Sequence, residues 1–357
     1  MKNLPKILLI GCGQLGSRHL QALAGLDNIK DVHIVDINPD SLDLGRLRLK
    51  ETPDLNPNIK FQWFSQINQE SRAQENDLCI VATQAKGRCE LIKRIADQLG
   101  YRNFIVEKIV SQSIGEYLDL MDFSGKKDLR IWVNCKTRAY AIHKYIKSLL
   151  NPSEAILLTD AGGNHGLANN GIHSADLFVF FDGAQEIKEG GIRIDPLLHP
   201  SKRGEDLYDL SGTLCGYSQK GSRYILSFDK NHNQPNQISI VTSQWRFIID
   251  HFKKIAFESN ARFDWQWKEI RLEENYLVSR MTRTFASDIL SKGRCDLPTL
   301  RECFPAHEFI LKTLLVYFNR LRKSNENYSD ASPDVTSGLG RSSDLRRSVG
   351  TAKEKMP

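Results

Sequence analysis

A glycine turn between an apolar run and a helical pattern is the feature that most constrains the fold of this chain. Residues 6–19 read KILLIGCGQLGSRH, so an apolar segment ends at Gly11 and two further glycines follow it. A continuous apolar run suits a strand that is covered on both faces. After the turn, apolar residues recur at helical spacing. This segment therefore predicts a strand–turn–helix unit of the α/β class.

The same residues match the fingerprint of a dinucleotide-binding turn. In a G-x-G-x-x-G pattern, Gly11 permits the tight turn, Gly13 lets the backbone approach a pyrophosphate, and Gly16 lets the helix pack closely on the strand. A second apolar run over residues 32–35 ends in Asp36, about twenty residues after the last glycine. A carboxylate there accepts hydrogen bonds from ribose hydroxyls and repels a 2′-phosphate, which favours NAD over NADP. The alternative is a glycine turn of another α/β unit, with Asp36 capping a loop.

Length and texture predict two domains and a tail. A chain of 357 residues exceeds one typical core. Alternating strands and helices predict a Rossmann dinucleotide-binding domain over residues 1–150. Strand-like runs separated by turn residues predict an α+β domain with an open, mainly antiparallel sheet over residues 151–323. Residues 324–357 have hardly any apolar side chains and are expected to be disordered.

The expected elements of the second domain are short. Its strands are predicted over residues 155–159, 192–194, 212–217, 224–228 and 238–241. Helices are predicted over residues 171–181, 275–292 and 300–321, with the two later helices packing back on the second sheet. The tryptophans Trp245, Trp265 and Trp267 are expected to face the sheet or a partner subunit, with stacking on a sugar as the alternative.

The composition argues against several other classes of protein. The sequence has no run of eighteen apolar residues, so no membrane-spanning helix is expected. The first residues enter the predicted strand almost at once, which leaves no room for a signal peptide and predicts a cytoplasmic location. A net charge of +6 without a clustered basic face predicts no nucleic-acid binding. Seven scattered cysteines without a C-x-x-C pair predict reduced thiols and no bound metal.

Three further patterns follow the glycine turn in order. Residues 82–85 read ATQA, residues 106–108 read VEK, and residues 169–176 read NNGIHSAD at the start of a helix. With these motifs the chain resembles the glucose–fructose oxidoreductase/inositol dehydrogenase (Gfo/Idh/MocA) family over residues 1–320. The combination carries the likeness, and no single motif does.

The resemblance implies a sugar-oxidising site. In that family the lysine of an E-K-P motif lies beside the nicotinamide and the sugar hydroxyl, and a D-x-G-x-H-x-x-D segment completes the site. Here Glu107 and Lys108 match the first motif, and Gly171, His173 and Asp176 match the second. The resemblance thus implies hydride transfer between nicotinamide and a carbinol carbon. Histidine at position 173 suits proton transfer near neutral pH, and a lysine ammonium stabilises a developing alkoxide.

The chain departs from the family pattern at three places. Ile109 replaces the proline of E-K-P, Asn169 stands where the family often has aspartate, and the usual A-T-P-N-x-x-H stretch ends in Arg88. A cis peptide bond before a residue other than proline costs about 2.5–4 kcal/mol. If the family geometry uses such a bond, Ile109 is expected to displace Lys108. The change at Asn169 removes a carboxylate from the site.

The site residues expected from these motifs fall into two groups. The dinucleotide is expected to contact Gly11, Gly13, Gln14, Leu15, Gly16, Asp36, Thr83, Glu107 and Lys108. The substrate is expected to meet the catalytic pair, Lys108 and His173, and the neighbouring residues Asn169, Asp176, Asn134 and Arg138, with Asn164 and His165 as similar candidates. Each has a structural alternative, such as a solvated Lys108, a structural His173 or a salt bridge of Asp176.

The expected function is an NAD-dependent oxidoreductase, with NADP less favoured. Its substrate would be a secondary hydroxyl of a sugar, amino sugar or sugar nucleotide. The departures keep two alternatives open, a regulatory protein that binds a dinucleotide or sugar without turnover, and a hydrolase or epimerase with tightly bound, recycled NAD. The resemblance also implies a homo-oligomer formed through the second sheet.

Overall fold

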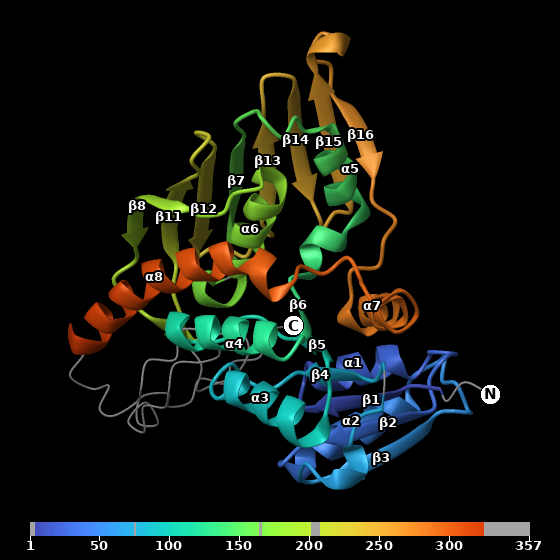
Figure 1. Cartoon of the computed structure of the whole chain (residues 1–357). Helices are drawn as coiled ribbons and strands as arrows, with labels where there is room; N and C mark the ends of the chain where they lie inside the picture. The colour runs from blue at the N-terminus through green and yellow to red at the C-terminus, as the bar shows by residue number, and fades with distance from the viewer. Residues whose placement is uncertain (1–3, 75, 164–165, 201–207, 325–357) are drawn as a thin grey trace, which may run out of the picture.

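Two β-sheets, one parallel and one mainly antiparallel, organise the chain (Figure 1). The computed structural model describes residues 4–74, 76–163, 166–200 and 208–324. The first sheet has six strands in the order β3-β2-β1-β4-β5-β6, and the second has eight in the order β16-β15-β14-β13-β7-β12-β11-β8. This arrangement confirms the predicted fold class, a Rossmann domain followed by an α+β unit with an open sheet.

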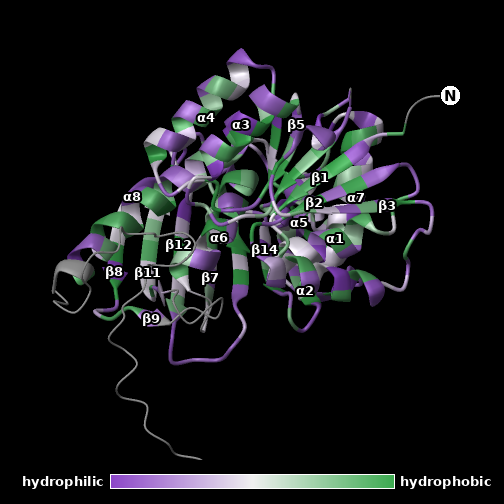
Figure 2. Cartoon of the chain, turned by 90° about the horizontal axis from the view of Figure 1, so that it is seen from below, coloured by the Kyte–Doolittle hydropathy of each residue, from purple (hydrophilic) through white to green (hydrophobic). Residues whose placement is uncertain are grey.

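The parallel sheet is built as the sequence predicts. Its strands are β1 (Lys6–Ile10), β2 (Asp31–Val35), β3 (Lys60–Phe64), β4 (Leu78–Val81), β5 (Asn103–Val106) and β6 (Arg130–Val133). The helices that follow the strands are α1 (Gly16–Leu23), α2 (Pro39–Lys50), α3 (Arg88–Leu99) and α4 (Ile114–Lys126). Every residue of β4 is buried, as expected for a strand covered on both faces. The hydrophobic colouring of Figure 2 accordingly follows β1 and β2, whereas α4 alternates between hydrophilic and hydrophobic residues.

The second sheet is larger than predicted. Its strands are β7 (Leu157–Gly163), β8 (Lys188–Ile194), β11 (Gly212–Tyr217), β12 (Arg223–Asp229), β13 (Gln237–Val241), β14 (Trp245–Asp250), β15 (Ile255–Asn260) and β16 (Lys268–Arg271). The first five strands were predicted from the sequence, and the last three were not. Of these three, only β16 is an edge strand, and its charged sequence KEIR gives a weak apolar signal. The strands β14 (WRFIID) and β15 (IAFESN) lie inside the sheet, and their apolar residues were overlooked.

The three tryptophans singled out in the sequence lie in or beside the missed strands. Trp245 of β14 is half-buried and stacks on Phe247, with 5.6 Å between the ring centroids. Trp265 and Trp267 lie in the connection between β15 and β16, and both rings contact the guanidinium of Arg246 at 4.6 and 5.1 Å. Trp245 therefore packs on the sheet, whereas Trp265 and Trp267 are exposed and contact it through Arg246.

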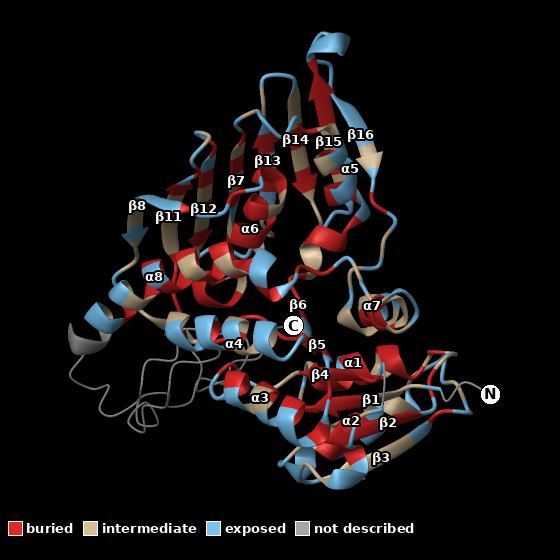
Figure 3. Cartoon of the chain, in the orientation of Figure 1, coloured by how far each residue is buried: buried red, intermediate tan, exposed pale blue. Residues whose placement is uncertain are grey.

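Helices cover one face of the second sheet. They are α5 (Ala141–Leu149), α6 (Leu167–Asp182) and α8 (Leu300–Ser324), and the short turn η2 (Lys136–Ala139) precedes α5 (Figure 1). A separate two-stranded pair, β9 (His199–Pro200) and β10 (Tyr208–Asp209), lies beside the start of α6. Buried residues concentrate on the strands and on α6 (Figure 3). Among the described residues, α6 is thus the central helix of this half.

Helix α7 (Val278–Lys292) returns to the first sheet. Its buried residues Phe285 and Ile289 share a core with Leu20 and Leu23 of α1. The expectation that both late helices pack on the second sheet is therefore wrong for α7, because its apolar stripe complements α1. It holds for α8, which packs on α6 and β8 and also meets α4.

Some predictions fall outside the described residues. The predicted tail is one of them, since only Ser324 of residues 324–357 is described. Asn164 and His165 are also outside. No helix in the described part of the chain combines the length and the hydropathy that a bilayer crossing needs.

Candidate active site

The three glycines of the turn have distinct surroundings. Gly11 follows β1 with a φ of +87°, and a Cβ added there would lie 2.9 Å from the carbonyl group of Ala82. A Cβ on Gly16 would lie only 1.9 Å from the carbonyl oxygen of Gly11, so α1 packs directly against the turn. A Cβ on Gly13 would meet nothing closer than the hydroxyl of Ser41 at 3.8 Å. Two glycines thus serve conformation and packing, and the third leaves open space.

Asp36 is attached to this turn. It follows β2, and its carboxylate accepts hydrogen bonds from the backbone N–H of Cys12 at 2.6 Å and of Asn38 at 2.9 Å. An unpredicted cation, Arg48 of α2, donates to the carbonyl oxygen of Gln14 and to the hydroxyl of Ser17, both at 2.6 Å. The sequence gives no local signal for this contact, because Arg48 is 34 residues from Gln14. The carboxylate and the glycine turn therefore form one rigid unit.

Glu107 follows β5 and is almost completely buried. Its carboxylate accepts hydrogen bonds from His19 Nε2 at 2.9 Å and from the side chain of Asn134. Burial alone would raise the pKa of Glu107, but these hydrogen bonds and the charges of His19 and Lys108 lower it to about 2. His19 Nδ1 also contacts the hydroxyl of Thr282 on α7 at 2.8 Å. An ionised Glu107 thus links α1, the end of β6 and, through His19, α7. Asn134 is one of its hydrogen-bond donors in this network.

Arg88 supports the loop after β5. It is 2% exposed, and its guanidinium donates to the backbone carbonyls of Thr83, Glu107 and Ile109. The Lys108–Ile109 peptide bond is cis, although residue 109 is not proline. The departure at Ile109 therefore keeps a cis peptide, and Arg88, which stands where the family has histidine, contacts the carbonyl oxygens on both sides of it.

Helix α6 brings the predicted catalytic residues together. Lys108 is buried, and its ammonium donates to the backbone carbonyl of Asn169 in the first turn of α6. His173 lies one turn later, so Asn169 and His173 share a face of the helix. His173 is half-buried, whereas Gly171 packs on Leu226 of the sheet, where a Cβ would be 3.0 Å from that side chain. The Lys108 ammonium thus meets α6 one turn before the residue that carries the imidazole.

Two other predicted site residues form a structural ion pair. The carboxylate of Asp176 is fully buried, and Arg138 binds both of its oxygens, through Nε at 2.7 Å and Nη2 at 2.6 Å. Arg138 Nη2 also donates to the carbonyl of Glu302 on α8. Burial alone would lower the pKa of Arg138, but Asp176 raises it. The pair therefore joins η2, α6 and α8, and its groups are already bound to one another.

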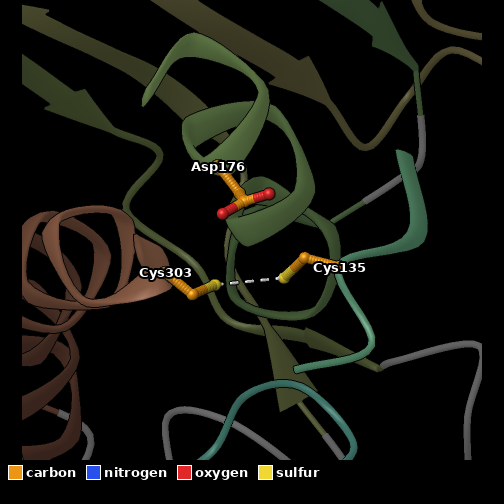
Figure 4. A group of neighbouring side chains, drawn as sticks. All are labelled: Cys135, Asp176 and Cys303. Carbon is orange, nitrogen blue, oxygen red and sulfur yellow. Dashed lines mark hydrogen bonds between the residues drawn. The ribbon is translucent and has the colours of Figure 1, made fainter. Parts of the chain in front are cut away.

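Two thiols lie beside this ion pair (Figure 4). The Sγ atoms of Cys135 and Cys303 are 3.5 Å apart, and these atoms and a carboxylate oxygen of Asp176 all lie within 4.8 Å of one another. This is the spacing of a metal site. However, Arg138 binds both oxygens of Asp176, and burial raises the pKa of both thiols. The group therefore lacks open ligands, and all seven cysteines of the chain are free, as predicted.

Two further polar residues near the site were not predicted. Lys136 follows Cys135, burial lowers its pKa to about 8, and its ammonium donates to the carbonyl of Tyr276. Asp209 lies on β10 and accepts a hydrogen bond from the side chain of Asn169. No local pattern points to Asp209, because forty residues separate it from Asn169.

The sequence matches no known family model, and no curated protein is significantly similar to it. Solved structures resemble it closely in shape. An oxidoreductase from Agrobacterium radiobacter, in complex with NAD+, L-tartaric acid and magnesium, superposes with a TM-score of 0.69 at 14% identity, over 89% of this chain and 97% of its own. A 3-ketoreductase from Actinomadura kijaniata, a lysine-to-alanine mutant in complex with TDP-benzene and NADP, gives 0.65 at 15% identity, over 88% and 98%.

A third neighbour is UDP-N-acetylglucosamine 3-dehydrogenase from Acidithiobacillus ferrooxidans. Its TM-score is 0.60 at 14% identity, over 92% of this chain and 99% of its own. The chain has the fold of these oxidoreductases. The resemblance that the sequence motifs indicated is thus confirmed at the level of the fold, over almost the whole length of each neighbour.

Proposed function

We propose that this protein is an NAD-dependent oxidoreductase that acts on a secondary hydroxyl of a sugar, amino sugar or sugar nucleotide. One observation carries the proposal: the ammonium of Lys108 is bound to the first turn of α6, one turn before His173. The neighbours support it, since one is a 3-ketoreductase and another a UDP-N-acetylglucosamine 3-dehydrogenase.

The glycine turn fits a dinucleotide. The open side of Gly13 leaves space for a pyrophosphate beside the start of α1, where Gln14, Leu15 and Gly16 present backbone N–H groups. The carboxylate of Asp36 would accept hydrogen bonds from a ribose and repel a 2′-phosphate. One neighbour was crystallised with NAD+ and another with NADP, so the charge of Asp36 is the reason to favour NAD. Thr83, at the end of β4, adjoins this turn.

The side chains supply the proton chemistry. A bound nicotinamide would supply the hydride acceptor. His173 would take the proton of the substrate hydroxyl, since imidazole titrates near neutral pH. The ammonium of Lys108 would stabilise the negative charge that develops on the same oxygen. Glu107, whose pKa is about 2, stays ionised beside Lys108.

Absorbance at 340 nm with NAD+ and a panel of sugars and nucleotide sugars tests this proposal. We expect Lys108→Ala and His173→Ala to lower kcat by about 10²-fold or more. His173→Ala should bind NAD+ as the wild type does. Lys93→Ala, which removes only the ion pair with the exposed Glu90 on α3, is the matched control and should keep full activity.

The same assay separates the alternatives when substrate mass is followed together with NADH. Tight NAD+ binding without any change in substrate would indicate a regulatory protein. A changed substrate mass without net NADH would indicate a hydrolase or epimerase with recycled NAD. Either result would contradict the proposed oxidoreductase.

We also propose a homo-oligomer through the open face of the second sheet. On this face Ile248 pairs with Phe257, and both are half-buried, while their neighbours Phe247 and Ala256 point to the helices. Sedimentation of the wild type should show an assembly that Phe257→Glu dissociates. A monomeric wild type at micromolar concentration would refute this.

A further inference from the structure

Asp209 brings a buried carboxylate to the first turn of α6. It is 2% exposed, and each of its oxygens accepts two hydrogen bonds. Oδ1 accepts from the backbone N–H of Ala168 at 2.7 Å and of Leu210 at 2.8 Å. Oδ2 accepts from the side chain of Asn169 at 2.5 Å and from its backbone N–H at 3.2 Å. The carboxylate therefore holds both the backbone and the side chain of Asn169.

The start of α6 is shaped around this carboxylate. Gly166 precedes the helix with a φ of +72°, and a Cβ there would lie 1.9 Å from Asp209 Oδ2. The next residue, Leu167, donates its backbone N–H to the carbonyl of Leu210 at 2.8 Å. The β10 strand and the helix start are thus fixed to each other by backbone and side-chain bonds together.

Asn169 is also the contact of Lys108. The Lys108 ammonium donates to the carbonyl oxygen of Asn169, the residue that Asp209 holds. Buried charges are stable in proteins only when they are paired or hydrogen-bonded. Asp209 and Lys108 are both buried, and each meets this condition because it is hydrogen-bonded to Asn169.

We propose that Asp209 is a positioning residue of the active site, a role that rests on the proposed function. Asp209 holds Asn169, and through Asn169 it holds the Lys108 ammonium in line with His173. Asp209 also provides a negative charge near the position where Asn169 replaces the aspartate that the family often has. The role is indirect, because Asp209 contacts Asn169 and not the substrate.

Asp209→Asn is the informative substitution, because it keeps Oδ1 as an acceptor and removes only the charge and Oδ2. In the full-length protein, competitive acetylation with acetic anhydride followed by mass spectrometry reports how strongly the Lys108 amine is held. We expect Lys108 labelling to rise about three- to tenfold in this variant. In the NAD+ assay we expect kcat to fall about 10- to 100-fold, with the KM for NAD+ unchanged.

A reciprocal exchange distinguishes positioning from a merely structural role. In Asn169→Asp combined with Asp209→Asn, an amide and a carboxylate again face each other with the charge moved by one residue. This double variant should recover most of the lost kcat and the low labelling of Lys108. Asp182→Asn is the matched control, since Asp182 is a buried carboxylate at the other end of α6, bound by Lys220 at 3.1 Å. It should leave Lys108 labelling as in the wild type.

The outcomes separate this inference from the proposed function. Unchanged Lys108 labelling in Asp209→Asn overturns the inference, whatever the activity. Labelling that rises while the wild type oxidises none of the substrates keeps the Asp209–Lys108 link and refutes the oxidoreductase. If Asp209→Asn does not fold, Asn169→Ala removes the side-chain bond to Asp209 and keeps the backbone bond, and unchanged Lys108 labelling in that variant overturns the inference.

Discussion

At the scale of single residues, the buried Glu107 makes the free energy of unfolding depend on pH in the acidic range. Its pKa is about 2 in the folded protein against an ordinary 4.5, so the folded state favours the carboxylate. This contribution is complete above about pH 4.5 and is lost as the pH falls towards 2, and it amounts to about 3 kcal/mol. Urea unfolding between pH 2.5 and 7 should therefore show a steeper loss of stability in the wild type than in Glu107→Gln.

The control for this prediction is the exposed carboxylate of Glu90 on α3. Glu90→Gln should leave the slope of stability against pH as in the wild type. Equal slopes for the wild type and Glu107→Gln would mean that the His19–Glu107–Asn134 network does not stabilise the anion.

Gly16 and Gly13 differ in the space that each would leave for a side chain. A Cβ at position 16 would lie 1.9 Å from backbone, whereas a Cβ at position 13 has space. We expect Gly16→Ala to lower the free energy of unfolding by about 1–3 kcal/mol. Gly13→Ala should leave it almost unchanged and weaken NAD+ binding. Thermal unfolding and NAD+ titration of both variants check this, and equal stability losses would contradict it.

At the scale of elements, α7 is held to the first sheet by a buried hydrogen bond as well as by apolar packing. The hydroxyl of Thr282 contacts His19 Nδ1, and both residues are buried. Thr282→Val keeps the shape and removes the partner of a buried imidazole, which costs about 1–3 kcal/mol. Thr284→Val, on the exposed side of the same helix, should cost much less in urea unfolding. If the two variants lost similar amounts of unfolding free energy, the contact with His19 would not be the cause of the loss.

The helices and strands also show which parts of the fold and of the candidate site could be predicted from the sequence. The parallel strands follow from apolar runs such as residues 78–81, because strands buried on both faces need nothing else. Lys108 and His173 were predicted from motifs, and the structure places the Lys108 ammonium on the first turn of α6, one turn before His173. Asp209 and Thr282 could not be predicted, because their partners lie 40 and 263 residues away and only the tertiary fold pairs them. Whether the named residues bind substrate stays a prediction.

At the scale of the whole molecule, the two sheets share a core. One continuous cluster of buried apolar residues includes Val106 and Val133 of the first sheet and Phe178 and Tyr224 of the second half. We therefore expect the described parts to unfold together. With fluorotryptophan at all five tryptophan positions, the 19F resonances of Trp63 and Trp132 in the first sheet and of Trp245 in the second should shift at one urea midpoint. Two separate midpoints would show that the sheets unfold independently.

The path of the chain through α7 restricts how such a protein can be recombined. The chain leaves the first sheet after β6, returns to it as α7 and leaves again for α8. An exchange of the second half between homologues would need three splice points, and any single crossover would separate α7 from α1 or α8 from α6. New second halves would therefore arise by amino-acid substitution more readily than by the shuffling of one gene segment.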